Sequence, residues 1–131
     1  MATDTQLPRT SKAMYWSGWV VTALPVLMLF MSAGMKLART DDVLKEMARL
    51  GYPESTIVGI AITEITCAIL YAIPQTSVLG AILLTGYLGG ATATHVRVGD
   101  PFVPPIVFGA VVWLGLFLRD ARIRALIPWR R

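Results

Sequence analysis

The sequence predicts an all-α fold, an integral membrane four-helix bundle with a short amphipathic interfacial helix between the first and second spans. Three observations lead to this fold class. The 131 residues are 55% hydrophobic, and only 15% are charged, against roughly 25% in soluble domains. Four apolar runs also approach the ~20 residues that cross a bilayer. This length accommodates a single transmembrane domain, residues 1–131.

A polar N-terminal tail over residues 1–12 precedes the first span, at about residues 14–37. That span is too long for the hydrophobic region of a signal peptide, so we expect it to be retained. The later elements are three more spans and a basic C-terminal tail, at about residues 55–73, 78–98, 102–118 and 119–131.

Residues 41–51 (DDVLKEMARLG) predict the amphipathic helix. Val43, Met47 and Leu50 fall on one face at helical spacing, and the charged residues fall elsewhere. Such a helix lies along the membrane interface. Gly51 is a typical helix terminator, so we expect the helix to end there.

The short turn at residues 74–77 makes the second and third spans antiparallel neighbours. Basic residues favour the cytoplasmic side of a membrane protein. The side with both termini and this turn has seven of them: Arg9, Lys12, Arg119, Arg122, Arg124, Arg130 and Arg131. The other side has five: Lys36, Arg39, Lys45, Arg49 and Arg97. Both termini are therefore predicted to be cytoplasmic.

Glu64 lies at the centre of the second span. A charged residue there costs about 2.5–3.5 kcal/mol, so it faces the bundle interior and needs a partner. Counting equal distances from the turn places Tyr87 of the third span at the same depth, as the expected hydrogen-bond partner. Two interpretations stay open: a functional acid, or a buried hydrogen bond that holds helices together.

The third span carries the spacing Gly86-x-x-x-Gly90. Small residues at this spacing either let two helices touch or leave room for a ligand. Both arrangements need glycine, so the sequence leaves both open.

Polar residues gather at the membrane side opposite the termini. Lys36 and Arg97 either extend to lipid headgroups or line the mouth of a site with Asp100. His95, the only histidine, is either a helix-end hydrogen bonder or a group that titrates near neutral pH. With Glu64 as the floor, these residues predict a cavity for a small amphipathic molecule.

The composition argues against a disulfide, a metal site and a nucleic-acid-binding surface. The single cysteine, Cys67, lies in an apolar run, so no internal disulfide or redox-active pair can form. One histidine and one cysteine make a protein-only metal site improbable, so no metal is expected. The basic residues sit at the ends of apolar runs, which indicates membrane topology and not nucleic-acid binding.

Three segments resemble the DoxX-like family: SAGMKLA, GYPESTIVGIAITEI and LTGYLGGATATHVRVGDPF. The resemblance covers about residues 14–127. It implies a small four-helix protein of the bacterial cytoplasmic (inner) membrane. Some relatives resemble the membrane subunit of a thiosulfate:quinone oxidoreductase, and others are linked to membrane oxidoreductase complexes that handle thiol stress.

The residues carried over from this resemblance form one expected site. The candidate catalytic residues are Glu64, His95 and Tyr87. The candidate ligand-binding residues are Lys36, Gly90, Thr92, Arg97 and Asp100.

Three functions fit these residues. The first is a subunit or partner of a membrane oxidoreductase, with an intramembrane pocket for a quinone. The second is a membrane enzyme of the isomerase, cyclase or dehydrohalogenase type, with Glu64 as acid or base. The third is a small-lipid binding or transport protein, for which a homo-oligomer would supply more helices. All three place the chain among membrane lipids with a lipophilic small molecule.

The predicted orientation is testable by labelling. A cysteine placed near the C-terminus of a Cys67→Ala variant is expected to resist a membrane-impermeant maleimide in intact cells. It should react once the cytoplasmic face is accessible. Labelling from outside alone would overturn the orientation.

Overall fold

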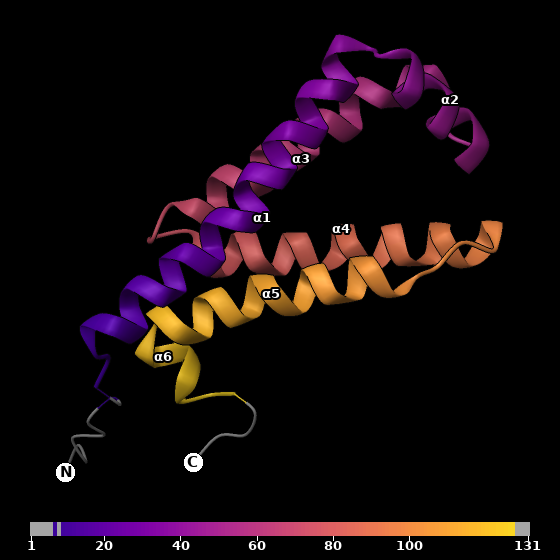
Figure 1. Cartoon of the computed structure of the whole chain (residues 1–131). Coiled ribbons are helices and arrows are strands. Elements are labelled where there is room, and N and C mark those ends of the chain that lie inside the picture. Colours follow the sequence, from indigo (N-terminus) through magenta and orange to yellow (C-terminus); the bar gives the residue numbers. More distant parts are fainter. Residues whose placement is uncertain (1–6, 8, 128–131) are drawn as a thin grey trace.

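The computed structural model describes Leu7 and residues 9–127, and within these it is helical without strands (Figure 1). The elements are α1 (Lys12–Ala38), α2 (Asp41–Leu50), the 3-10 helix η1 (Glu54–Thr56), α3 (Ile57–Ala72), α4 (Ser77–Val98), α5 (Val103–Arg119) and α6 (Ala121–Arg124). The predicted all-α class is confirmed. Three helical segments, α1, η1–α3 and α4, are long and apolar enough to cross a membrane, and α5 is a shorter apolar helix.

The four long helices form a bundle that is closed at one end and splayed at the other. Both α1 and α4 pack against α3 and α5. Figure 1 shows α1 and α3 leaning away from α4 and α5: the pairs are close near α6 and the α3–α4 turn, and apart near α2. We call these the closed end and the splayed end.

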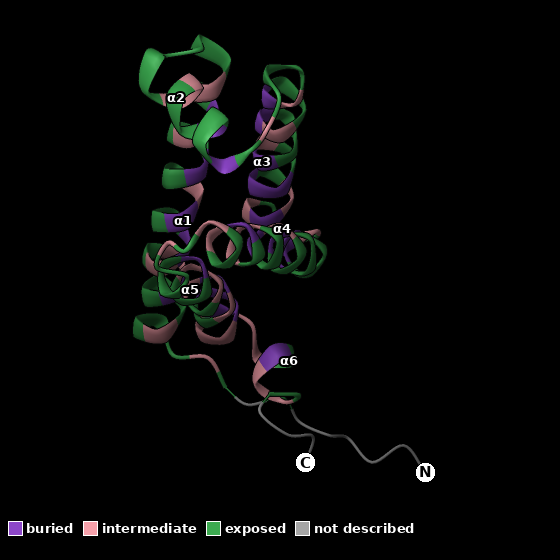
Figure 2. Cartoon of the chain, turned by 90° about the vertical axis from the view of Figure 1, so that its right-hand side faces the viewer, coloured by how far each residue is buried: buried purple, intermediate pink, exposed green. Residues whose placement is uncertain are grey.

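Each long helix buries one stripe and exposes apolar side chains around the rest of its surface (Figure 2). In α1 the buried stripe includes Thr22, Leu29 and Ala33, at helical spacing. Val20 and Leu27, on the other faces of α1, are 71% and 67% exposed. An apolar surface of this extent is compatible with lipid as the solvent, and this chain is a membrane protein.

The amphipathic helix forms where the sequence predicts it. The side chain of Thr40 accepts a hydrogen bond from the backbone N–H of Val43 at 3.3 Å, which caps the start of α2. Gly51 ends the helix in the left-handed region, with φ 86°. The apolar face buries Met47 and Leu50 against the splayed end of the bundle.

The closed end depends on glycines that let backbones approach. A Cβ added at Gly80 would lie 2.3 Å from the backbone nitrogen of Tyr71. A Cβ at Gly115 would lie 2.7 Å from the hydroxyls of both Thr22 and Tyr71. The Tyr71 side chain is fully buried there, and its hydroxyl donates to the carbonyl of Val112 at 2.7 Å. This contact fixes α3 to α5.

The C-terminal region differs from the predicted tail. Arg119 is still the last residue of α5, and α6 follows it. The N-terminal prediction lies mostly outside the described residues, as do residues 128–131.

A pair of glycine substitutions tests this packing. Gly80→Ala should lower the free energy of unfolding by about 1–3 kcal/mol, because its Cβ would overlap the α3 backbone. Gly86→Ala on the same helix meets nothing within 4 Å and should be neutral or stabilise by up to about 1 kcal/mol. Denaturation in detergent measures the free energy of unfolding of both variants. Equal values would contradict the close approach of α3 and α4 at Gly80.

Candidate functional site

Glu64 is buried in α3, with 3% of its side chain exposed, and it meets groups from two other helices. Its Oε1 atom accepts from Lys36 Nζ of α1 at 2.9 Å and from Ser32 Oγ at 3.2 Å. The hydroxyl of Tyr87, from α4, donates to the same oxygen. The predicted contact between Glu64 and Tyr87 is therefore present, and Lys36 adds an ion pair.

Lys36 points into the bundle and not out to headgroups. A helical side chain leans toward the N-terminus of its own helix, and Lys36 follows this direction. Its Nζ donates to Ser32 Oγ, one turn earlier in α1, at 2.7 Å. With 13% of its side chain exposed, Lys36 balances the Glu64 charge inside the protein.

A cavity of about 500 Å³ opens beside this ion pair, which lies within the ~300–1,000 Å³ range of small-molecule sites. Its walls come from α1, α2, the α2–η1 turn, α3 and α4. The lining residues are Ser32, Lys36, Met47, Leu50, Tyr52, Ile60, Glu64, Gly86, Tyr87, Gly90, Ala91, Thr94 and His95.

The two glycines of the GxxxG spacing face open space. A Cβ added at Gly86 or Gly90 would meet no atom within 4 Å in the described part of the chain, and both residues line the cavity. The glycines at which an added Cβ would lie within 3.0 Å of another helix or its side chains are Gly18, Gly80 and Gly115. Of the two interpretations left open by the sequence, the geometry favours room beside α4 over helix packing at this spacing.

His95 lines the cavity near the splayed end. Its Nδ1 lies 2.7 Å from the carbonyl of Ala91, one turn earlier. A carbonyl only accepts, so in this contact Nδ1 is the donor, and Nε2 is the ring nitrogen left for another partner. His95 thus makes the helix-end hydrogen bond considered from the sequence and also presents an imidazole to the cavity.

The helix α2 is held over the splayed end by Arg49. Its Nη1 and Nη2 donate to the two carboxylate oxygens of Asp100, at 3.1 and 2.6 Å. Its Nε also donates to Glu46 at 3.0 Å. The Arg49 hydrogen bonds hold the pKa of Asp100 and that of Glu46 below their usual ranges. We call the Arg49–Asp100 pair the latch.

Two further contacts join the end of α2 to α4. The guanidinium of Arg97 donates to the carbonyl of Leu50. The hydroxyls of Tyr52 and Thr94 lie 2.7 Å apart. Arg97 and Asp100, predicted to bind a ligand, do not line the cavity and contact the helix that covers it. Ligand binding by these two residues stays a prediction.

The cavity wall offers polar atoms that are not yet used. Glu64 Oε2 is buried and has no hydrogen-bond partner among the described residues. Lys36 has a third N–H beyond its bonds to Ser32 and Glu64. A ligand here can donate to the Glu64 carboxylate or to His95, and can accept from Lys36.

Most predicted site residues gather around this cavity, namely Lys36, Glu64, Tyr87, Gly90 and His95. Thr92 is not among the residues that line it, and its hydroxyl donates to the carbonyl of Leu88 at 2.8 Å within α4.

The sequence interpretation missed Ser32, Tyr52 and Thr94. Ser32 lies one turn before Lys36, and this spacing alone placed it on the same helix face. The Tyr52–Thr94 contact joins residues far apart in the chain, and no local pattern signals it.

Comparison with known families gives one result. The DoxX-like family matches residues 20–116, which is well over half of the chain. The chain belongs to the DoxX-like family. This DoxX-like protein has no match among curated proteins or solved structures. The matched region contains the latch and the Glu64 cluster, by which we mean Ser32, Lys36, Glu64 and Tyr87.

The latch can be tested by hydrogen exchange. A depressed Asp100 pKa means that the ion pair is intact above the ordinary carboxyl range and is lost as the pH falls through the lowered value, below about 4. Near neutral pH, Arg49→Gln should speed amide exchange in α2 up to about fivefold, the size typical of an exposed ion pair. High salt screens the ion pair and should speed amide exchange in α2 in the same way.

Arg122→Gln is the matched control, because it breaks the Asp120–Arg122 pair, which lies in the α5–α6 region at the closed end. Unchanged exchange in the Arg49 variant would show that the latch does not hold α2.

Proposed function

We propose that this DoxX-like protein is a subunit or partner of a membrane oxidoreductase and that its cavity holds a quinone-like molecule. One observation carries the proposal: Glu64, whose buried Oε2 has no partner among the described residues, is one of the residues that line a cavity of about 500 Å³. A buried carboxylate oxygen is costly unless something donates to it. A molecule with a hydroxyl group and an apolar body satisfies that oxygen and fills the space.

The reduced and oxidised forms of a quinone match different groups of the cavity. A quinol hydroxyl can donate to Glu64 Oε2 or to His95 Nε2, and a quinone carbonyl can accept from Lys36. Oxidation of a quinol releases two electrons and two protons. Under this proposal Glu64 and His95 take the protons, and the electrons pass to a partner protein, because a chain with one cysteine has no redox-active cysteine pair.

The proposal includes the membrane in which the protein lies and its orientation there. We place the protein in the bacterial cytoplasmic membrane with both termini cytoplasmic, on the basis of the seven and five basic residues on its two sides. The closed end then faces the cytoplasm, and α2 with the latch lies at the opposite surface.

A pair of leucine variants tests ligand binding. Gly90→Leu places a side chain in the cavity, whereas Gly89→Leu, at the neighbouring position on α4, adds the same volume outside the cavity lining. Gly90→Leu should weaken binding of a short-chain quinone at least about tenfold, since it excludes the ligand from its site. Gly89→Leu should bind like the unaltered protein.

Titration calorimetry measures the affinity, and mass spectrometry identifies molecules that co-purify in mild detergent. Absence of quinone binding in the unaltered protein, or equal loss in both leucine variants, would overturn the proposal.

The same carboxylate oxygen favours a second candidate, a proton-transfer enzyme of the isomerase, cyclase or dehydrohalogenase type. Glu64 would then be the acid or base. Replacing Glu64 alone leaves Lys36 as an unpaired buried charge, which costs about 3–5 kcal/mol. The double variant Lys36→Met with Glu64→Gln removes both charges together and is the better test.

A co-purifying molecule that is converted without an electron acceptor, at a rate abolished in the double variant, would favour this enzyme over the oxidoreductase partner. A lipid released unchanged would favour binding or transport.

A further inference from the structure

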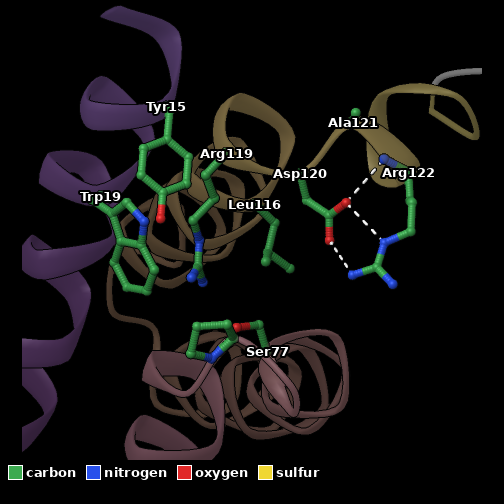
Figure 3. Close-up of a pocket in the computed structure, with 9 residues that line it drawn as sticks. Tyr15, Trp19, Ser77, Leu116, Arg119, Asp120, Ala121 and Arg122 are labelled. Carbon is green, nitrogen blue, oxygen red and sulfur yellow. Dashed lines mark hydrogen bonds and ion pairs between the residues drawn. The ribbon is translucent and has the colours of Figure 1, made fainter. Parts of the chain in front are cut away.

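A second pocket lies at the closed end of the bundle and shares no lining residue with the cavity beside Glu64 (Figure 3). It has a volume of about 210 Å³ and is bounded by the start of α1, the α3–α4 turn and the α5–α6 junction. Figure 3 shows the guanidinium of Arg119 beside the ring of Trp19 and facing Ser77. The proposed quinone site uses none of these residues.

Arg119 is a buried cation without a counter-ion among the residues that the structure describes. Only 9% of its surface is exposed. No carboxylate among the described residues lies within 4.0 Å of its guanidinium, and its buried Nε has no hydrogen-bond partner there. Its Nη2 donates to the carbonyl of Tyr71 at 3.0 Å, and its Cζ lies 4.2 Å from the Trp19 ring centroid. These contacts orient the charge and do not neutralise it.

The one carboxylate that lines the pocket is already paired. Asp120 accepts from the Arg122 side chain through both oxygens, each at 3.2 Å, and from the Arg122 backbone N–H at 2.9 Å. The charged residues that line the pocket are Arg119, Asp120 and Arg122, so the pocket has one net positive charge. An anion entering it meets a donor on Arg119 that no other group occupies.

The start of α4 adds to the positive potential. Ser77, the first residue of α4, lines the pocket, and no side chain caps that helix. The Ser77 hydroxyl itself donates back to the carbonyls of Tyr71 and Ile73, at 3.0 and 2.8 Å. The positive end of the helix dipole is therefore open to an anion.

We propose that this pocket binds an anionic phosphate group, with the Arg119 guanidinium as its principal ligand. Such a group is carried by anionic phospholipids and also exists free in solution. The pocket is at the membrane-surface end of the bundle, and Tyr15 and Trp19, residues typical of the membrane–water interface, form its wall. A phospholipid headgroup is thus the source that fits the position, while its acyl chains lie along the exposed apolar faces.

The test compares lipid affinities of the full-length protein in detergent by native mass spectrometry. Short-chain phosphatidylglycerol should bind at least about tenfold more tightly than phosphatidylcholine, because only the former brings net negative charge to Arg119. Inorganic phosphate is the second arm. If millimolar phosphate displaces the lipid, the site also binds free phosphate. If it does not, the site binds the lipid headgroup alone.

Two variants locate the site. Arg119→Gln should abolish the preference, but loss of a buried side chain also endangers folding. Ala121→Glu keeps Arg119 and adds a carboxylate at the pocket wall, so it should reduce the preference about tenfold. Ala125→Glu adds the same charge outside the pocket lining and should leave the preference within about twofold.

Equal affinity for the two lipids in the unaltered protein would overturn the proposal. So would an unchanged preference in a folded Ala121→Glu variant.

Discussion

The structure depends on the requirement that a charge within a bilayer be paired. Glu64 and Lys36 meet this requirement together, because each is the counter-ion of the other at 2.9 Å. The pair joins α1 to α3, and Tyr87 adds α4 to the same carboxylate. Three helices are thereby held at one point, beside the cavity in the splayed half of the bundle. The polar cluster is both the floor of the cavity and a structural connection.

Glycines do opposite things in the two halves of the molecule. At the closed end, Gly80 and Gly115 bring backbones and side chains so close that a methyl group would overlap its neighbours. In the splayed half, a Cβ added at Gly86 or Gly90 would meet no described atom within 4 Å, and the missing side chains leave room in the cavity. The same residue type therefore closes one end and opens the other, and α4 contains both kinds.

Much of this arrangement could be predicted from the sequence, because apolar runs of membrane length and a short turn determine helix order and relative depth. Depth counting also found Tyr87 opposite Glu64. The direction of the Lys36 side chain was not decided, since an interfacial lysine can extend either way. The amphipathic pattern predicts which face of α2 is apolar. It does not predict the surface that this face covers. The position of Gly86 beside a cavity depends on the splay of the helix pairs, and no local sequence pattern predicts that splay.

The unequal lengths of the helices matter for the surrounding bilayer. The 17 residues of α5 span about 25 Å, whereas the 27 residues of α1 span about 40 Å, against ~30 Å of hydrocarbon. Thinning of the bilayer accommodates a helix as short as α5, and tilting accommodates one as long as α1. Each ångström of mismatch costs a fraction of a kcal/mol, so membrane thickness acts on the angle between the helix pairs. Lipid chain length sets that thickness, so we expect it to affect the width of the splayed end.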